Sequence, residues 1–137
     1  MFEIVEEHLR KREWAEAEVE CRSCIQQQPI LARGHGLLGL ILYRQARYEE
    51  AVPSLQRAVA LDPNFHDAGA LLAQTLDRLQ RYKEALEVAR ETIKLRPNDL
   101  QLTLLIEGLS RQVDEKTDAW ERSVNLDWHH VTLAQKE

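Results

Sequence analysis

Residues 38–63 read LGLILYRQARYEEAVPSLQRAVALDP, and residues 72–97 repeat the same pattern as LAQTLDRLQRYKEALEVARETIKLRP. The two stretches are 34 residues apart, and three sets of positions keep this period over a longer part of the chain. They are Pro29, Pro63 and Pro97; Trp14, Tyr48 and Tyr82; and Ala17, Ala51 and Ala85. A fixed period of this length is typical of a solenoid, in which each pair of helices buries its apolar face only against neighbouring pairs. The repeat therefore predicts a helical stack with an extended surface for binding.

Two kinds of residue mark the ends of the predicted helices. Proline with Asp or Asn closes each unit, as in residues 62–64, because proline cannot continue a helix and Asn or Asp caps the next one. A short basic stretch, such as residues 44–47, breaks each unit once more at a helix end that attracts cations. No segment alternates apolar and polar residues at a period of two, so strands are not expected. The pattern predicts an all-α fold with helices near residues 2–10, 13–27, 32–45, 48–61, 65–79, 82–95, 99–112 and 116–127.

Length and composition limit the classes of function. The chain has 137 residues, enough for four units of 34, with 44% hydrophobic and 30% charged residues, as in a soluble globular protein. A net charge of −5 argues against a nucleic-acid partner, since phosphate binding requires a basic face. The first residues lack the apolar core of a secretion signal, and the longest apolar run, residues 36–43, is too short to cross a bilayer. Two cysteines do not make a disulfide framework, so we expect a cytoplasmic protein without membrane insertion.

The two central units carry the spacing of a known repeat. The second unit contributes Leu38, Gly39, Leu42, Tyr48, Ala51, Leu55, Ala58, Leu61 and Pro63, and the third contributes Leu72, Ala73, Leu76, Tyr82, Ala85, Ala89, Leu95 and Pro97. At these positions the chain resembles the tetratricopeptide repeat (TPR) family. The first unit keeps Trp14, Ala17 and Pro29, whereas the fourth has Lys116 in place of the aromatic residue and Val131 in place of proline.

The resemblance implies a right-handed superhelix of antiparallel helix pairs, in a single domain over residues 1–137. About three TPR units would occupy residues 1–31, 32–65 and 66–99. A degenerate C-terminal pair at 100–128 would cap the stack, followed by a tail at 129–137. Such a departure from the repeat is expected in a terminal unit, because it must end in a polar face.

In TPR proteins the first helix of each pair lines the concave groove of the superhelix. Helix 32–45 is apolar on nearly all sides, which requires burial on both faces or an exposed apolar patch. We predict that an apolar or amphipathic peptide or helix binds in this groove, with the arginines beside acidic residues of the partner. The residues predicted to hold it are Arg33, Leu37, Leu40, Tyr43, Arg44, Leu71, Gln74, Arg78 and Leu105.

Three occupants of this groove agree with the sequence. The first is a capping segment of the chain itself, containing Trp120, Val124, Trp128 and Val131. The second is a helix or peptide of a protein partner, and the third is another copy of the chain, which would form a homo-oligomer. A tail can also occupy the same groove that a partner uses, so these alternatives overlap.

One subtype of the family can be tested from the sequence. TPR domains of co-chaperones bind the C-terminal carboxylate of heat-shock chaperones with a clamp of Lys, Asn and Arg. The positions that correspond to the clamp hold Phe2, Glu6, Leu37, Asp67 and Leu71. None of these side chains donates a charge-assisted hydrogen bond to a carboxylate, so the chain is not expected to belong to this subtype.

The motifs of the chain do not support catalysis or a cofactor. Residues 34–39 spell G-x-G-x-x-G, but no predicted strand precedes them, so a dinucleotide-binding loop is not expected. Cys21 and Cys24 spell C-x-x-C, but they lack the further ligands of a zinc site and fall at core positions of the repeat. His129 and His130 are adjacent, and two neighbouring imidazoles alone do not make a metal site. The sequence predicts a non-catalytic protein without cofactor or metal.

Three other functions remain open at this point. The chain can be the interaction arm of a larger enzyme such as a transferase, which a catalytic domain in the full gene would reveal. It can be a TPR-type secretion chaperone, which an adjacent secretion locus would favour. It can also be a purely structural homo-oligomer, which sedimentation at several concentrations would detect.

Overall fold

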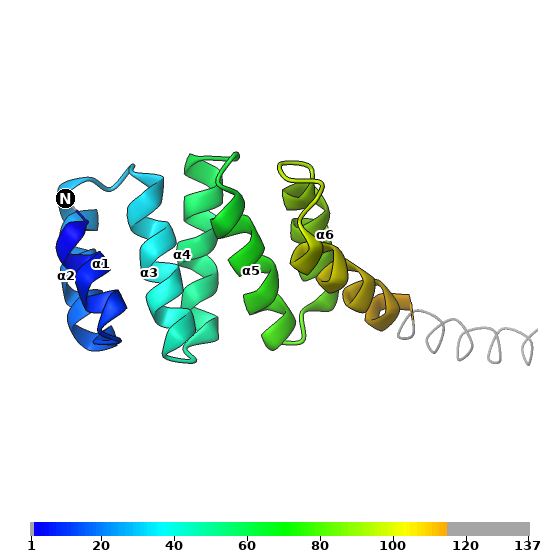
Figure 1. The fold of residues 1–137 in the computed structure, drawn as a ribbon, viewed down its shortest axis with the longest axis horizontal. Coiled ribbons are helices and arrows are strands. Elements are labelled where there is room, and N and C mark those ends of the chain that lie inside the picture. Colours follow the sequence, from blue (N-terminus) through cyan, green and yellow to red (C-terminus); the bar gives the residue numbers. More distant parts are fainter. Residues whose placement is uncertain (1, 115–137) are drawn as a thin grey trace, which may run out of the picture.

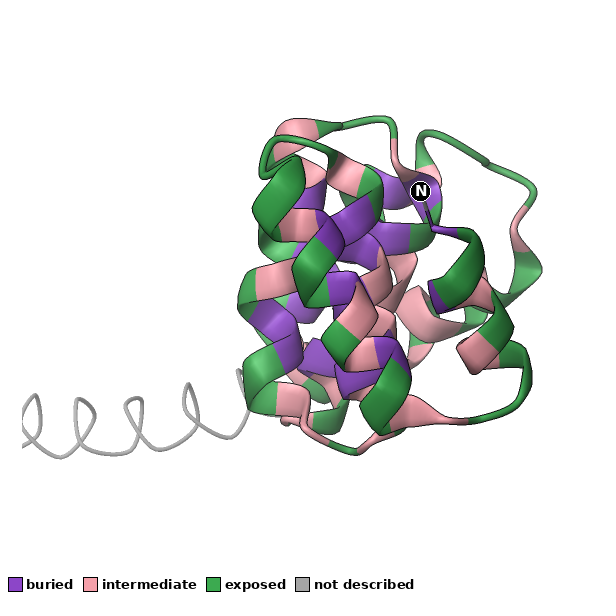
Figure 2. Ribbon diagram, turned by 90° about the vertical axis from the view of Figure 1, so that its left-hand side faces the viewer, coloured by how far each residue is buried: buried purple, intermediate pink, exposed green. Residues whose placement is uncertain are grey.

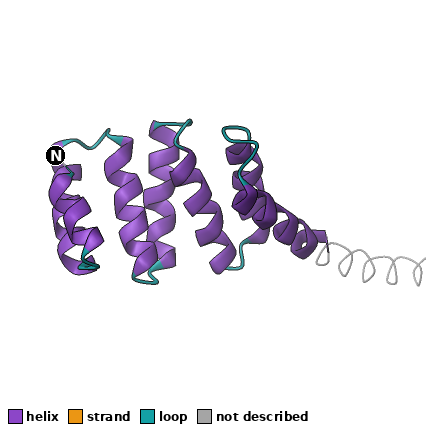
Figure 3. Ribbon diagram, in the orientation of Figure 1, coloured by secondary structure: helices purple, strands orange, loops and turns teal. Residues whose placement is uncertain are grey.

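The computed structural model describes residues 2–114, and all regular structure in this part of the chain is helical (Figures 1 and 3). The prediction of an all-α fold is confirmed. Six helices begin and end within two residues of the predicted bounds. The helix predicted at 116–127 and the tail at 129–137 lie outside the described residues. The helices are α1 Glu3–Arg10, α2 Trp14–Gln27, α3 Ala32–Arg44, α4 Tyr48–Leu61, α5 His66–Arg78 and α6 Tyr82–Ile93, followed by a helical segment at residues 100–114.

The helices are arranged as a row of antiparallel pairs. Each of α1 to α6 packs mainly against the helix before it and the helix after it in the chain. Helix α3 also contacts α5, so the first helices of neighbouring pairs touch one another. This is the stack that the 34-residue period predicts, in which each unit touches only its neighbours.

The turn inside each pair contains one residue with a left-handed backbone. Arg12, Ala46 and Gln80 have φ angles of 60°, 61° and 62°, and they recur at the period of the repeat. After Ala46, the backbone N–H of Arg47 donates to the carbonyl oxygen of Leu42 at 2.9 Å, and the equivalent bond in the other two pairs has the same length. This geometry satisfies carbonyl groups at the helix end, which offsets the roughly 1 kcal/mol that a non-glycine residue loses in the left-handed region.

The core depends on small residues at the points where helices cross. Ala17, Ala51 and Ala85, which share one position of the repeat, are fully buried. Leu55 of α4 is also fully buried and lies against Gly39 of α3. In Figure 2 the buried segments run through the middle of the stack, between the helices. Close approach of the helix axes therefore requires the small residues that the repeat supplies.

The glycines near the start of α3 are explained by the same close packing. A Cβ atom at Gly34 would lie 3.1 Å from Cγ1 of Ile25, and one at Gly36 would lie 2.9 Å from the ring of Phe65. The G-x-G-x-x-G pattern thus arises from helix packing, and residues 34–39 lie within α3 rather than in a loop after a strand. Contact with a ligand is not needed to account for these glycines.

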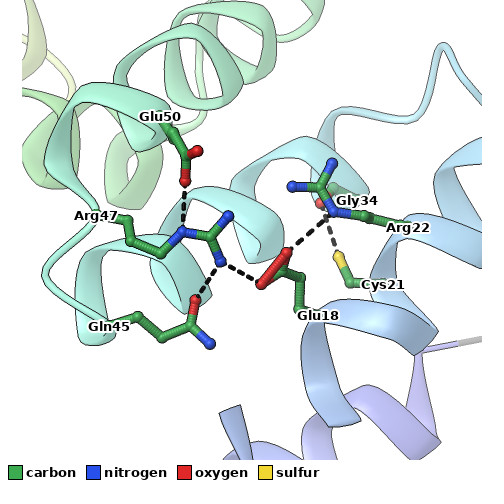
Figure 4. A network of polar contacts seen from close by, with 7 residues as sticks. All are labelled: Glu18, Cys21, Arg22, Gly34, Gln45, Arg47 and Glu50. Atoms are coloured by element: carbon green, nitrogen blue, oxygen red, sulfur yellow. Dashed lines mark hydrogen bonds and ion pairs between the residues drawn. The ribbon is translucent and has the colours of Figure 1, made fainter. Parts of the chain in front are cut away.

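Both cysteines lie in the core, as the repeat predicts. Cys21 and Cys24 of α2 are both buried and form no disulfide with each other. The Cys21 thiol donates to the carbonyl oxygen of Gly34 at 3.2 Å (Figure 4), and burial raises its pKa to about 12. Because the thiolate is the reactive and metal-binding form, Cys21 stays an unreactive thiol at neutral pH.

A polar network joins the first two pairs at the open edge of this core (Figure 4). Arg47, at the start of α4, donates to Glu18 of α2 at 2.6 Å and to Gln45 at 2.8 Å, and it also pairs with Glu50. Arg22 donates to the other oxygen of Glu18 at 3.2 Å. Burial of the Glu18 carboxyl tends to raise its pKa, but the hydrogen bonds from Arg47 and Arg22 outweigh that effect and lower the pKa below 4.5.

Replacing Glu18 with glutamine should therefore lower the free energy of unfolding by about 1 kcal/mol at neutral pH. The lowered pKa in the folded state means that this contribution is complete above the unfolded value, near 4.5, and is lost as the pH falls through the folded value. Urea denaturation of wild type and Glu18→Gln across the acidic range measures the difference. Glu16→Gln is the control, because Glu16 is an exposed residue of the same helix. A difference that does not change with pH would contradict this role of Glu18.

Candidate partner-binding groove

A groove with a volume of about 900 Å³ lies between α3 and α5 and extends to the start of the segment 100–114. Its walls are the first helices of the second and third pairs, where the repeat predicts a binding surface. The predicted residues that line it are Arg33, Leu37, Leu40, Leu71 and Gln74. Five of the nine residues selected from the sequence are thus brought together in one groove.

The floor of the groove is apolar. Leu37 and Leu40 of α3 and Leu71 of α5 are half-buried, so each keeps part of its side chain accessible in the groove. Leu37 and Leu71 pack on the core with their other side. Leu31, in the turn before α3, adds a more exposed apolar side chain at the rim. The groove thus presents accessible apolar surface above a packed core.

Carboxylates gather at the end of the groove where the turns between pairs lie. Asp62 follows α4, Asp67 is in the first turn of α5, and Asp99 precedes the segment 100–114. Asp62 accepts the backbone N–H of Asn64 at 3.1 Å, and Asp99 accepts that of Leu102 at 3.2 Å. These bonds hold two of the three carboxylates in place through their own turns.

His66 lies beneath these carboxylates and is buried. Its Nδ1 atom is 3.4 Å from an oxygen of Asp67, and its Nε2 atom is 3.0 Å from Oδ2 of Asp99. The Nε2 atom nevertheless has no partner in hydrogen-bonding geometry among the described residues. The approach of Nε2 to Asp99 is therefore electrostatic proximity without the geometry of a directional hydrogen bond.

Arg33 lies on the wall formed by α3, and its side chain is paired with a residue of α1. Its guanidinium pairs with the carboxylate of Glu6 and lies 5.6 Å from the centre of the Phe2 ring. The ion pair and the cation–π contact hold this arginine against the first pair. Arg33 is thus part of the groove, but its charge is balanced within the chain.

The remaining predicted residues lie near the other end of α3 and α5 or beyond the groove. Tyr43, Gln74 and Arg78 border a second, smaller hollow of about 420 Å³. A hydrogen bond to Tyr43 raises the pKa of Arg78, so its guanidinium is charged at any ordinary pH. Arg44 is exposed at the end of α3, and Leu105 packs on the core; neither is among the residues that line the larger groove.

The positions of the carboxylate clamp can now be placed. Leu37, Asp67 and Leu71 line the groove, Phe2 is buried, and Glu6 is paired with Arg33. None of these five side chains is a cation, so none can bind a carboxylate in the groove through a charge-assisted hydrogen bond.

Sequence reasoning missed the residues that the turns bring into the groove. Asp62, Phe65, Arg96 and Asp99 line it, although they lie outside the helices whose spacing selected the candidates. The signal that could have found them is the Asp, Pro and Asn cluster between units, which places polar side chains at one end of every pair.

Residues 2–114 show neither a metal site nor a membrane span. This part of the chain has no group of three His, Cys, Asp or Glu residues placed to hold a metal ion. None of its helices is both long and apolar enough to cross a bilayer. His129 and His130, and the apolar residues Trp120, Val124, Trp128 and Val131 of the predicted capping segment, lie outside the described residues.

The sequence model of the tetratricopeptide repeat matches residues 37–99. These residues are therefore similar to tetratricopeptide repeats. The E3 ubiquitin-protein ligase CHIP of Arabidopsis thaliana is 33% identical to it over 54 residues, which make up 39% of this chain and 19% of the ligase. The chain therefore matches about a fifth of that longer protein.

Solved TPR domains share the fold. The TPR2B domain of yeast Sti1, solved in a pHsp70 complex, has a TM-score of 0.74 and 23% identity, over 80% of this chain and 92% of that chain. The second TPR domain of human RPAP3, solved with the HSP70 peptide SGPTIEEVD, has a TM-score of 0.73 and 17% identity, over 77% of this chain and 88% of that chain. The predicted superhelix of TPR-type helix pairs is confirmed by these likenesses.

Proposed function

We propose that this TPR protein is a non-catalytic interaction module, which holds an apolar or amphipathic peptide or helix in the groove between α3 and α5. The observation that carries the proposal is the set of half-buried leucines, Leu37, Leu40 and Leu71, which meet on the floor of one groove. Apolar side chains that remain accessible in a concave site are the usual basis of peptide-in-groove binding. The peptide complexes of the similar TPR domains support a protein or peptide as the kind of partner.

The predicted arginines have different parts in this proposal. Arg44 and Arg78 lie at the C-terminal ends of α3 and α5, where we expect them to contact acidic residues beside the bound segment. Arg33 is balanced by Glu6, so its contribution to an acidic partner is smaller. Charges at such a rim mainly increase the rate of association.

The leucines provide the test of this function. We expect the double variant Leu37→Ala and Leu71→Ala to reduce partner affinity about 100-fold, because each truncation removes roughly 1–2 kcal/mol of apolar contact. Capture from a lysate of the source organism with wild type and the double variant, followed by titration of the captured partner, measures this loss. Val19→Ala is the control, because Val19 is 68% exposed on α2, and it should leave binding unchanged.

Thermal denaturation of the same proteins separates binding from folding. The double variant should lose less stability than it loses binding energy, since both leucines are only half-buried. A loss of stability equal to the loss of affinity would identify Leu37 and Leu71 as core residues and end the proposal.

A second candidate is that the chain is the interaction arm of a larger enzyme. It is favoured by the match to CHIP, because the matched residues are a minor part of a protein named as a ubiquitin ligase. The apparent mass of the protein in extracts of the source organism, detected with an antibody to the repeats, tests this candidate. A single band at the 15.9 kDa of this chain would exclude it.

A further inference from the structure

The carboxylates at one end of the groove are not balanced by the cations around them. Asp62, Asp67 and Asp99 all line the groove and come from three separate parts of the chain. They lie toward the same end of the groove because the turn between α4 and α5 and the turn after α6 lie at the same end of the stack (Figure 1). We call these three residues the acidic end of the groove.

Within residues 2–114, few cationic side chains lie near the acidic end, and each is either screened by water or already paired. The Nη1 atom of Arg96 is 3.9 Å from Asp67, and the two side chains are 64% and 79% exposed, so water screens this pair. Arg33, across the groove, is committed to Glu6. His66 approaches two of the carboxylates, but a protonated ring together with Arg96 would still leave three negative charges facing two positive ones.

The carboxylates also keep capacity to accept hydrogen bonds. The bonds to the backbone at Asn64 and Leu102 use one oxygen each of Asp62 and Asp99. An ionised carboxylate offers about four lone-pair sites over its two oxygens. Asp67 is exposed, and among residues 2–114 the cationic or titratable side chains that approach it within 4 Å are Arg96 and His66.

We propose that the segment bound in this groove carries a lysine or arginine, whose charged group binds the acidic end. This inference rests on the proposed function, because the same segment places apolar side chains on Leu37, Leu40 and Leu71. The aliphatic stem of a lysine or arginine suits the adjoining leucines, while its charged head reaches the carboxylates. An acidic side chain at this end would instead meet like charges and lose affinity.

Selection from a phage-displayed library of random peptides on the immobilised full chain tests the inference. Peptides that are retained by wild type and lost on the Leu37→Ala and Leu71→Ala variant report binding in the groove. We expect most of them to contain a lysine or arginine beside apolar residues. Replacing that base with methionine in a synthetic copy of the most enriched peptide should weaken binding about tenfold.

A matched pair of protein variants tests where the lysine or arginine of the peptide binds. Asp67→Asn should weaken the basic peptide about fivefold to tenfold and leave its methionine version unchanged. Asp77→Asn makes the same change at the other end of α5 and should have no such effect. Thermal denaturation checks that both variants keep the fold, and since Asp67 is 79% exposed we expect them to do so.

The possible outcomes separate the inference from the function on which it rests. Groove-dependent peptides that are acidic or uncharged, or that bind Asp67→Asn as well as wild type, would overturn the inference and leave the proposed function standing. A selection in which no peptide depends on Leu37 and Leu71 would overturn both.

Discussion

Alanine at Gly39 should lower the free energy of unfolding by about 1–3 kcal/mol, although alanine is the better helix former by about 1 kcal/mol. The added Cβ atom would lie 2.5 Å from both Cγ and Cδ2 of Leu55. Leu55 is fully buried in α4 and cannot move away without disturbing the core around it. The overlap therefore outweighs the gain in helix propensity. Urea denaturation followed by circular dichroism measures the change.

Gly108 supplies the matched control. It lies in the helical segment 100–114, and a Cβ atom there would meet nothing within 4 Å. Gly108→Ala should consequently stabilise the protein by up to about 1 kcal/mol, from helix propensity alone. If the two alanine variants shifted stability in the same direction and by the same amount, close approach at Gly39 would not be what the repeat requires there.

A double-mutant cycle with Leu55 identifies the clash. Leu55→Ala alone should cost about 2–5 kcal/mol, because it leaves a cavity in the core. In that background Gly39→Ala should cost little, since the atoms that it would strike are gone. A coupling energy of at least about 1 kcal/mol between the two changes is expected. Additive effects would mean that Gly39 matters for a reason other than contact with Leu55.

Most of this fold could be predicted because the same pattern of residues occurs in three successive units. The proline, aromatic and alanine positions fix the helix boundaries, and the small residues fix which faces meet. The turns inside the pairs were less visible. Arg12, Ala46 and Gln80 adopt left-handed backbones, yet none is the glycine or asparagine that usually marks such a turn. Their conformation is imposed by the packing of the two helices that they join.

The sequence predicted which residues of one helix face the groove, but it did not predict the contacts between residues of different helices. Helical spacing selected Leu37, Leu40 and Leu71, which line one groove, because spacing is a property of a single helix. The pairing of Arg33 with Glu6 joins residues from different units, and no local pattern shows it. The net charge of the groove depends on such long-range ion pairs. The sequence therefore indicated an apolar surface, but it did not show which charged side chains of the groove are already paired within the chain.

Alanine at Leu109 should lower the stability of the last described helix by about 2–5 kcal/mol. Leu109 is 1% exposed and belongs to the common core. Leu102, on the same face of this helical segment, is also part of that core. Truncation would leave a cavity where the segment 100–114 packs on the stack. Hydrogen exchange measured by mass spectrometry reports the stability of this segment separately from the rest.

The position of the change in the stack decides how far its effect spreads. Because each unit is held only by its neighbours, amides in 100–114 should exchange much faster in Leu109→Ala, while those in α1 to α4 keep the protection of the wild type. Leu104→Ala removes the same atoms from a side chain that is 57% exposed in the same segment, and it should change exchange by less than about 0.5 kcal/mol. Equal acceleration over all helices would show that the protein unfolds as one cooperative unit, whereas a loss confined to 100–114 would show that the stack opens from this end.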